Sequence, residues 1–206
     1  PGALETLSSL RGLGKRIAFL SNNPTHSRAE YATKLTRLGL PTPIHDIINS
    51  SVVLADFLKR RMPGARLFVL GEEPLCQELR ANGFIVADGP VDAAAIDAVI
   101  ASFDRSLAYW KLQVAFDAIR QGARFFATNG DRYCPVPISA TTPTGGQPDA
   151  AAVIAAIEAC TNTRVEAIVG KPSEHTAAAI LAMMQLPAER CLMTGDRLET
   201  DVQMGI

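Results

Sequence analysis

The sequence lacks an excess of charge of either sign. Its 206 residues include 20 lysines and arginines against 21 aspartates and glutamates, so the formal net charge is −1. Proteins that bind nucleic acids or anionic membrane surfaces usually carry a basic excess. We therefore expect neither nucleic acid nor a membrane as a partner, and any anionic ligand must be held by a local site.

The four cysteines form no recognisable ligand or redox pattern. They are scattered, without a CxxC pair or a nearby histidine cluster: Cys76, Cys134, Cys160 and Cys191. This spacing argues against a zinc site or a thiol redox motif, and it leaves disulfide bonds open. Scattered thiols fit a reducing compartment better than an oxidising one, so we expect a cytoplasmic protein.

Long hydrophobic runs are also absent. A membrane-spanning helix needs roughly 20 consecutive apolar residues, and the longest runs fall well short of that length. No secretory signal pattern is present. The chain opens at Pro1 without a methionine and stops at "DVQMGI", within a helical pattern. We therefore expect a segment of a longer protein, truncated at both ends.

Short apolar runs alternate with helical patterns along the whole chain. The runs that predict strands are 16–20, 66–70, 95–103, 123–128, 166–169 and 190–194. Such runs, separated by helices, are typical of strands buried on both faces of a parallel sheet. The alternation therefore predicts an α/β fold.

Local signals indicate where several helices begin. Ser27 with Glu30 forms a capping box before "AEYATKLTRLG". Ser51 and Ser173 are predicted to cap the helices at "VVLADFLKRRM" and "EHTAAAILAMMQ". Turn-forming residues gather at 129–148. A loop of that length is uncommon in a compact domain unless it serves a function.

Polar segments follow three of the predicted strands. They are Ser21-Asn22-Asn23, Gly170-Lys171-Pro172-Ser173, and the stretch from Gly195 to Asp201. In open α/β sheets the ligand crevice lies outside the carboxyl ends of the strands. We therefore expect all three segments to face one crevice.

The residue types in these segments suit a phosphate group. Ser21 and Asn22 offer short hydrogen-bond donors for a phosphoryl oxygen. Lys171 supplies a compact positive charge, and Asp196 and Asp201 are hard oxygen ligands of the kind that Mg2+ prefers. The sequence thus predicts a phosphate and magnesium site.

Each segment alone has a simpler interpretation. Ser-Asn-Asn is a common turn, and a lone lysine is usually a solvated surface charge. Lys171 is not a P-loop lysine, because Val165 stands where that pattern needs glycine. "GDRLETD" could be a helix start with acidic residues near its positive end. Their occurrence together, each after an apolar strand, favours the functional interpretation.

Taken together, these segments resemble the haloacid dehalogenase (HAD) superfamily of phosphohydrolases. The similarity is to the branch with a large α/β cap (type IIA), which includes nitrophenylphosphatase-like and nucleotide monophosphatase-like enzymes. "FLSNN" is similar to the second motif of this branch, "VGKPS" to the third and "MTGDRLETD" to the fourth. The resemblance implies a doubly wound parallel-sheet, Rossmann-like core at 1–48 and 165–206, with an inserted α/β cap at 49–164.

The resemblance implies phosphate-binding roles for four residues. Ser21 would bind the transferring phosphoryl group, and Asn22 and Asn23 would shape the loop around it. Lys171 would bridge the phosphate and the nucleophilic aspartate.

It also implies a metal site and a cap contribution. Asp196 would ligate Mg2+, and Asp201 would support the ion, directly or through a water. Asn129 and Asp131 would lie on the cap loop that faces the substrate. Ser21, Lys171 and Asp196 are accordingly the predicted catalytic residues.

One feature of the family does not occur in the sequence. Its first motif, DxDG, carries the nucleophile and a general acid/base, and no DxD is present. The resemblance places that motif upstream of "PGALETLSSL", so we expect the nucleophile in a segment before Pro1. The alternative is an inactive binding or regulatory relative.

The implied reaction is hydrolysis of a small phosphate monoester through an aspartyl-phosphate, with Mg2+ as cofactor. A phosphotransferase or mutase of the superfamily would share every motif present. A dinucleotide-binding oxidoreductase is disfavoured, because no GxGxxG follows any strand. The substrate stays open among nucleotide, sugar, glycolate and pyridoxal phosphates.

Apolar residues of one cap helix leave the oligomeric state open. They are Leu107, Trp110, Val114 and Phe116. We expect them to pack in the cap core, with a homodimer through the cap as the alternative.

Overall fold

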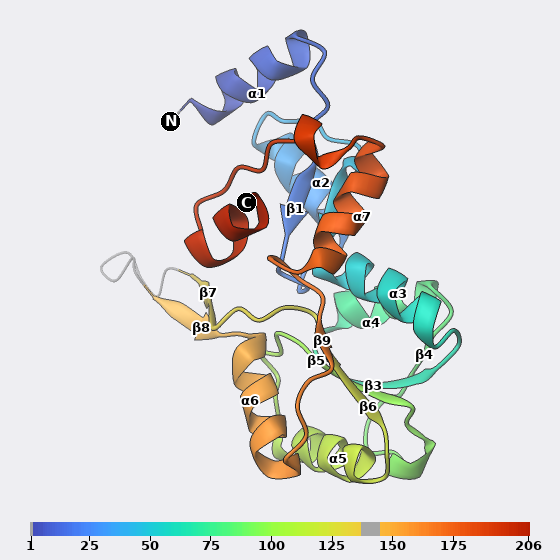
Figure 1. The fold of residues 1–206 in the computed structure, drawn as a ribbon. Helices are drawn as coiled ribbons and strands as arrows, with labels where there is room; N and C mark the ends of the chain where they lie inside the picture. Colours follow the sequence, from blue (N-terminus) through green and yellow to red (C-terminus); the bar gives the residue numbers. More distant parts are fainter. Residues whose placement is uncertain (1, 137–144) are drawn as a thin grey trace.

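The computed structural model describes residues 2–136 and 145–206. Part of the turn-rich stretch predicted at 129–148 therefore lies outside the described residues. The described chain forms two parallel sheets, one of five strands and one of two, and an antiparallel hairpin (Figure 1). The predicted α/β architecture with parallel strands is confirmed.

The larger sheet has the order β4-β3-β5-β6-β9, and all of its strands are parallel. Its strands are β3 (Arg66–Leu70), β4 (Ile85–Val86), β5 (Ala98–Ala101), β6 (Arg124–Ala127) and β9 (Ala167–Ile168). Successive strand side chains point to opposite faces. Leu67 and Val69 therefore belong to one hydrophobic core, and Phe68 and Leu70 to the other.

Four helices cover the two faces of this sheet. The first core contains side chains of α3 (Ser50–Arg61) and α4 (Glu73–Ala81), and the second those of α5 (Tyr109–Arg120) and α6 (Ala150–Thr161). The sheet is thus buried on both sides, which is why its strands are apolar runs without alternation.

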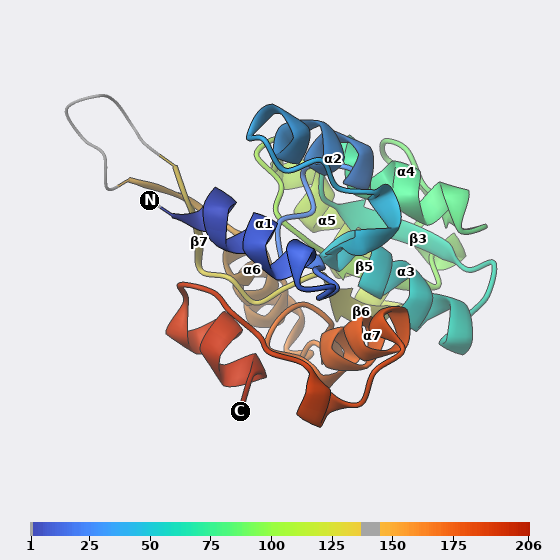
Figure 2. The ribbon, with the colours of Figure 1, turned by 90° about the horizontal axis from the view of Figure 1, so that it is seen from above.

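The smaller sheet pairs β1 (Phe19–Ser21) with β2 (Ile47–Asn49), and α2 (Arg28–Arg37) connects them. α7 (Glu174–Met184) packs beside α3 and extends the first core, as both ribbon views show (Figure 1, Figure 2). α1 (Ala3–Gly12) lies at the outer end and has no buried residue.

Short elements complete the described chain. The hairpin consists of β7 (Tyr133–Pro135) and β8 (Gly146–Pro148). The remaining turns are η1 (Ile44–Asp46), η2 (Ala93–Ala95), η3 (Ala188–Arg190) and the π-helical η4 (Leu198–Val202). No helix within the described ranges is long and apolar enough to cross a membrane.

The capping predictions were correct at two of three helices. Ser27 and Glu30 form the reciprocal capping box of α2, and Ser173 accepts a hydrogen bond from the amide of His175 in α7. At α3 the prediction was wrong. Asn49 is the cap there, because the helix begins two residues earlier than predicted, and the Ser51 hydroxyl is buried without a partner.

The strand predicted at 190–194 does not form. After η3 the backbone is extended at Cys191 but joins no ladder, and Leu192 is 88% exposed. An extended segment needs a neighbouring strand to satisfy its backbone groups, and none of the described strands lies beside this one. The prediction failed because periodicity reports apolar character and not the presence of a pairing partner.

The division into core and cap stays a prediction. β9, which that division assigned to the core, pairs with β6 in the five-stranded sheet.

The apolar residues predicted to pack in the cap core are divided in the structure. Val114 is buried, but Leu107 and Trp110 keep 40% and 38% of their surface exposed. Core packing was therefore the correct expectation for Val114 and the wrong one for Leu107 and Trp110, while Phe116 is half-buried. Leu107 precedes α5, and Trp110 in its first turn meets the ring of Phe68 edge-on at 6.2 Å.

The cap of α3 gives a stability prediction. Asn49 accepts from the Val52 amide and donates to the carbonyl of His26. Asn49→Ala should lower the free energy of unfolding by about 2 kcal/mol, because the Val52 amide and the His26 carbonyl both lose their partner.

Ser51→Ala is the matched control, measured by urea denaturation under the same conditions. It should change stability by less than about 0.5 kcal/mol, since its hydroxyl has no partner to lose. A larger cost for Ser51→Ala than for Asn49→Ala would contradict this assignment of the cap.

Candidate phosphate site at the strand ends

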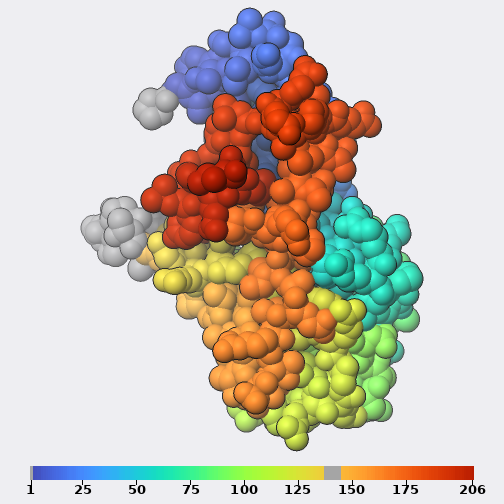
Figure 3. All heavy atoms as spheres, viewed as in Figure 1, coloured from blue at the N-terminus to red at the C-terminus, as the bar shows by residue number. Residues whose placement is uncertain are grey.

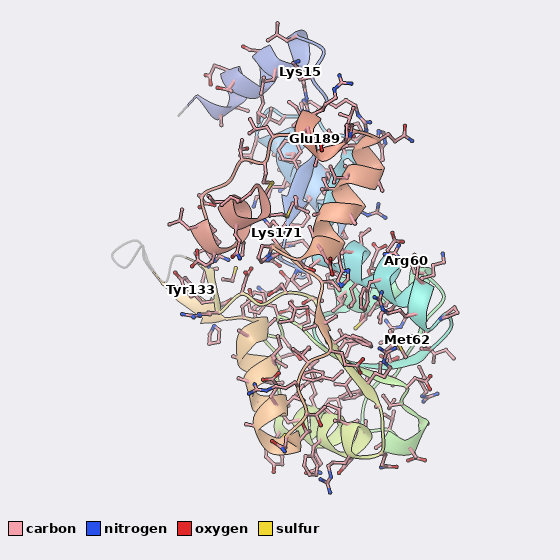
Figure 4. The ribbon with its side chains drawn as sticks, viewed as in Figure 1. Lys15, Arg60, Met62, Tyr133, Lys171 and Glu189 are labelled. Atoms are coloured by element: carbon pink, nitrogen blue, oxygen red, sulfur yellow. The ribbon has the colours of Figure 1, made fainter. Side chains whose placement is uncertain are left out.

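A cavity of about 180 Å3 lies where the loops after β1, β6 and β9 meet η4. It is lined by Leu20, Ser21, Asn22, Asn23, Asp131, Cys134, Pro135, Asp149, Lys171, Asp196, Arg197, Thr200 and Asp201. Lys171 lies between the part of the molecule that contains β1 and α2 and the part that contains the five-stranded sheet (Figure 4). The C-terminal segment lies against the hairpin on the same side (Figure 3).

The side chain of Asn22 joins two of the loops. Its Oδ1 accepts from the Lys171 amide at 2.7 Å, and its Nδ2 donates to the Lys171 carbonyl at 3.1 Å. The same Nδ2 lies 3.3 and 3.4 Å from the two carboxylate oxygens of Asp131. Asn22 thus fixes the position of the lysine and contacts the loop after β6.

The backbone carbonyl of Asn22 is also held. It accepts from the hydroxyl of Ser50 at 2.6 Å and from Nδ2 of Asn129 at 3.0 Å. Asn129 is fully buried and does not line the cavity, and its Oδ1 accepts from the Asp131 amide. Asn129 therefore supports the loop from behind.

Gly170 is the point where these loops approach most closely. A Cβ there would lie 2.6 Å from the carbonyl oxygen of Thr128, and 2.8 Å from both Asn129 Cβ and Asn22 Oδ1. Only a residue without a side chain fits this junction.

Lys171 and Asp201 form a buried ion pair at the cavity wall. The distance from Nζ to Oδ1 is 2.5 Å, and the side chains are 10% and 7% exposed. Burial raises the pKa of Asp201, but the hydrogen bond and charge of Lys171 and the amides of Arg197 and Asp196 outweigh it, so the pKa lies below its usual value. Asp201 is therefore a carboxylate at neutral pH.

Arg197 connects the same loop to the hairpin. Its Nη1 lies 3.1 Å from Asp131 Oδ2, and its Nη2 donates to the Tyr133 carbonyl at 3.0 Å. Its backbone amide donates to Asp201 Oδ2 at 3.3 Å. The sequence prediction contained Arg197 within "GDRLETD" but gave it no role, because nothing in the sequence tells which distant carboxylate it meets.

The segment 21–23 both forms a turn and lines the cavity. The Oδ1 of Asn23 accepts from the amide and hydroxyl of Thr25, which is the turn chemistry of an asparagine. The hydroxyl of Ser21 is 2.8 Å from that of Tyr31, and burial raises the pKa of this tyrosine. Ser21 lines the cavity and can rotate its hydroxyl towards a ligand.

The donor set fits part of a magnesium site. Asp196 is exposed at the cavity and Asp201 is buried beside it. Mg2+ is usually held by one or two carboxylates, several waters and the substrate phosphate, so two carboxylates are a suitable protein contribution. No group of three or more potential metal-ligating side chains occurs in the part of the chain that the structure describes.

Seven of the eight predicted site residues line this cavity, and Asn129 lies directly behind it. Their proximity is a finding, while their chemical roles stay predictions. The sequence prediction did not include Cys134, Asp149 or Thr200. Asp149 had a weak signal, since an aspartate before an alanine-rich run is a typical helix cap, and it does cap α6.

A parallel sheet with a polar cavity at the carboxyl ends of its strands defines a Rossmann-like α/β protein. Two family models match the chain: one described as haloacid dehalogenase-like hydrolase over residues 1–85, and one of HAD-hydrolase-like proteins over residues 168–206. The chain belongs to the HAD-like hydrolase family, in its type IIA branch of NagD- and p-nitrophenylphosphatase-like proteins.

The chain is similar to characterised phosphatases and to chronophin over nearly its whole length. It is 40% identical to the sugar-phosphatase AraL of Bacillus subtilis, over 99% of this chain and 72% of that protein. It is 35% identical to chronophin of Rattus norvegicus, over 100% of this chain and 67% of that protein. The p-nitrophenyl phosphatase of Archaeoglobus fulgidus superposes with a TM-score of 0.89 at 31% identity, covering 100% of this chain and 75% of that one.

Asp149 gives a prediction for the pH dependence of stability. Burial raises its pKa from 3.8 to about 6, with a contribution from Asp131. The folded state then holds a proton that the unfolded state has released, so stability is lost as the pH rises from about 4 to 6.

Asp149→Asn removes this loss and keeps a good helix cap. Its stability relative to the unmodified protein should rise by about 2–3 kcal/mol between pH 4 and pH 7, measured by urea denaturation. The exposed Asp56→Asn should show no such trend. A flat difference for Asp149→Asn would contradict the raised pKa.

Proposed function

We propose that the protein is a Mg2+-dependent phosphatase that hydrolyses a small phosphate monoester through an aspartyl-phosphate. The observation that carries this proposal is the buried Lys171–Asp201 pair beside Ser21 in one cavity at the strand ends. Phosphoryl transfer depends mainly on positioning and on neutralising the phosphoryl oxygens, and these residues suit both tasks.

The phosphate would be held by Ser21 and Lys171. The serine hydroxyl donates one hydrogen bond to a phosphoryl oxygen. The lysine ammonium attracts the phosphoryl oxygens, and this attraction strengthens as the transition state forms. Lys171 would also bridge the phosphate and the nucleophile. Asn22 keeps the lysine backbone in place, and Asn23 shapes the turn.

The metal ion would be held by Asp196, with Asp201 in support. When bound, Mg2+ would neutralise part of the charge on the phosphoryl oxygens and orient the phosphate. Of the two carboxylates only Asp196 is exposed at the cavity, so we assign it the direct contact. Asp201 would hold the second position, directly or through a water.

The nucleophile would come from outside the printed sequence, which contains no DxD. An aspartate carboxylate would attack phosphorus while the bond from phosphorus to the leaving-group oxygen breaks. A water would then release phosphate from the aspartyl-phosphate.

The leaving group would face the predicted cap loop at Asp131, which Asn129 supports from behind. The described lining of the cavity contains no aromatic side chain, so nothing there offers a stacking surface for a nucleobase or a pyridine ring. The small volume and the polar wall favour a compact metabolite. The names of the relatives, which include a sugar phosphatase, are in accord with this substrate class.

The test uses the full-length protein with nitrophenyl phosphate, with and without Mg2+. Lys171→Ala and Asp196→Ala should each lower kcat at least about 100-fold, the usual effect of losing a group that stabilises transition-state charge. The exposed residues Lys59 and Asp56 supply matched controls: Lys59→Ala and Asp56→Ala should retain full activity.

Full activity in both site variants would contradict the assigned roles. Adding an alcohol acceptor separates hydrolysis from transfer, because a phosphotransferase would form a phosphorylated acceptor. Absence of any phosphate release by the full-length protein would favour a non-catalytic relative.

A further inference from the structure

Five residues around the cavity form a closed circuit of contacts. Asn22 contacts Asp131, Asp131 pairs with Arg197, the Arg197 amide donates to Asp201, Asp201 pairs with Lys171, and the Lys171 backbone returns to Asn22. We call this circuit the polar ring. Its members come from four segments that are far apart in the sequence.

The link between Asp131 and Arg197 joins two segments of the polar ring. One is the segment 128–133, which leads from β6 into the hairpin and which we call the hairpin loop. The other is the loop that carries the predicted metal ligands Asp196 and Asp201. The side chain of Asp131 is 9% exposed and that of Arg197 is 30% exposed. A surface ion pair contributes little to stability. Removing one partner of a shielded pair costs much more, since a buried charge is left without compensation.

The geometry of Arg197 fits a connecting role. Its two terminal nitrogens bind the carboxylate of Asp131 and the carbonyl of Tyr133, so the guanidinium holds both side chain and backbone of the hairpin loop. Its own amide orients the second oxygen of Asp201. A displacement of the hairpin loop must therefore move the residue that orients Asp201.

We propose that Arg197 is a positioning residue: by holding Asp131, it couples the placement of the hairpin loop to the order of the loop that carries Asp196 and Asp201. This inference rests on the proposed function for its catalytic consequence but not for the coupling itself. Coupling between two sites is reciprocal. A ligand that orders the hairpin loop therefore also favours the observed arrangement of Asp196 and Asp201. Conversely, metal binding at these carboxylates favours the observed position of the hairpin loop.

A purely local role makes a different prediction. If each side chain only stabilised its own segment, loss of Asp131 would loosen the hairpin loop and leave the segment 195–202 unchanged. The proposed coupling requires both segments to loosen together, whichever partner is removed.

The experiment is hydrogen exchange with mass spectrometry on the full-length protein, without added metal. Asp131→Ala should speed exchange about tenfold at the Asp201 and Val202 amides, which donate to the Arg197 carbonyl. Arg197→Ala should do the same at the amides of Asp149 and Ala151, which donate to carbonyls of the hairpin loop. Tenfold corresponds to about 1.4 kcal/mol, within the coupling range of neighbouring charged residues.

The variant with both changes should exchange no faster than the single variants, because either change alone opens the polar ring. Arg197→Lys retains the charge and should restore part of the protection. Arg164→Ala is the matched control. Arg164, like Arg197, forms an ion pair with a carboxylate, that of Glu158 at 2.6 Å, but it lies outside the cavity and is 88% exposed. It should leave exchange unchanged in both segments.

Two further readouts extend the test. Calorimetric titration with Mg2+ should show about tenfold weaker binding in Asp131→Ala, although Asp131 is assigned no contact with the metal. KM for nitrophenyl phosphate should rise more than kcat falls. If Asp131→Ala does not fold, Asp131→Asn removes the charge with little change in shape and serves the same comparisons.

Faster exchange confined to the substituted segment, with unchanged Mg2+ affinity, would overturn the proposal. Faster exchange in both segments of a protein that releases no phosphate would support the coupling and count against the proposed function alone. The two inferences can therefore fail separately.

Discussion

The buried amide of Asn22 is the interaction on which the site depends. A primary amide has one acceptor oxygen and two donor hydrogens, and here its oxygen and nitrogen meet the two backbone groups of Lys171 and the carboxylate of Asp131. No aliphatic side chain could replace it without leaving buried polar groups unpaired. Asn22 follows strand β1 directly, and its amide holds both the lysine backbone and the loop after β6 in place.

The position of Asn22 follows from the parallel sheets. β6 and β9 are parallel neighbours in one sheet, so their carboxyl ends lie at one edge. β1 belongs to the other sheet, and its loop, more than a hundred residues earlier in the sequence, meets theirs at the cavity. Each loop contributes a few polar atoms, and the two hydrophobic cores hold the strands that carry the loops. The chemistry of the cavity is thus assembled by packing that lies elsewhere.

Much of this arrangement could be predicted from the sequence. The apolar runs of β3, β5 and β6 predicted a buried parallel sheet, and the polar residues after β1 and β9 predicted that their loops would lie together. These predictions succeeded because strand burial and strand direction are properties of local pattern. The capping box at Ser27 succeeded for the same reason.

The failures have a common physical cause. The extended segment at 190–194 needs a neighbour to become a strand, and the cap of α3 depends on where the helix begins. The exposure of Trp110 depends on which residues of other elements reach the first turn of α5. Arg197 was named only within a motif, because its partner Asp131 is 66 positions away in the sequence. Long-range pairing is the information that a local pattern lacks.

Gly170 shows how little room the site leaves for change. The space that a methyl group would fill is already occupied by the Thr128 carbonyl oxygen and Asn129 Cβ of one loop and by Asn22 Oδ1 of another. A library of random variants would therefore tolerate almost nothing at this position, whatever the polarity or charge of the new residue. Mutational sensitivity there would report the close packing of these loops and not a chemical role, so a position without any functional group would rank beside the lysine that follows it.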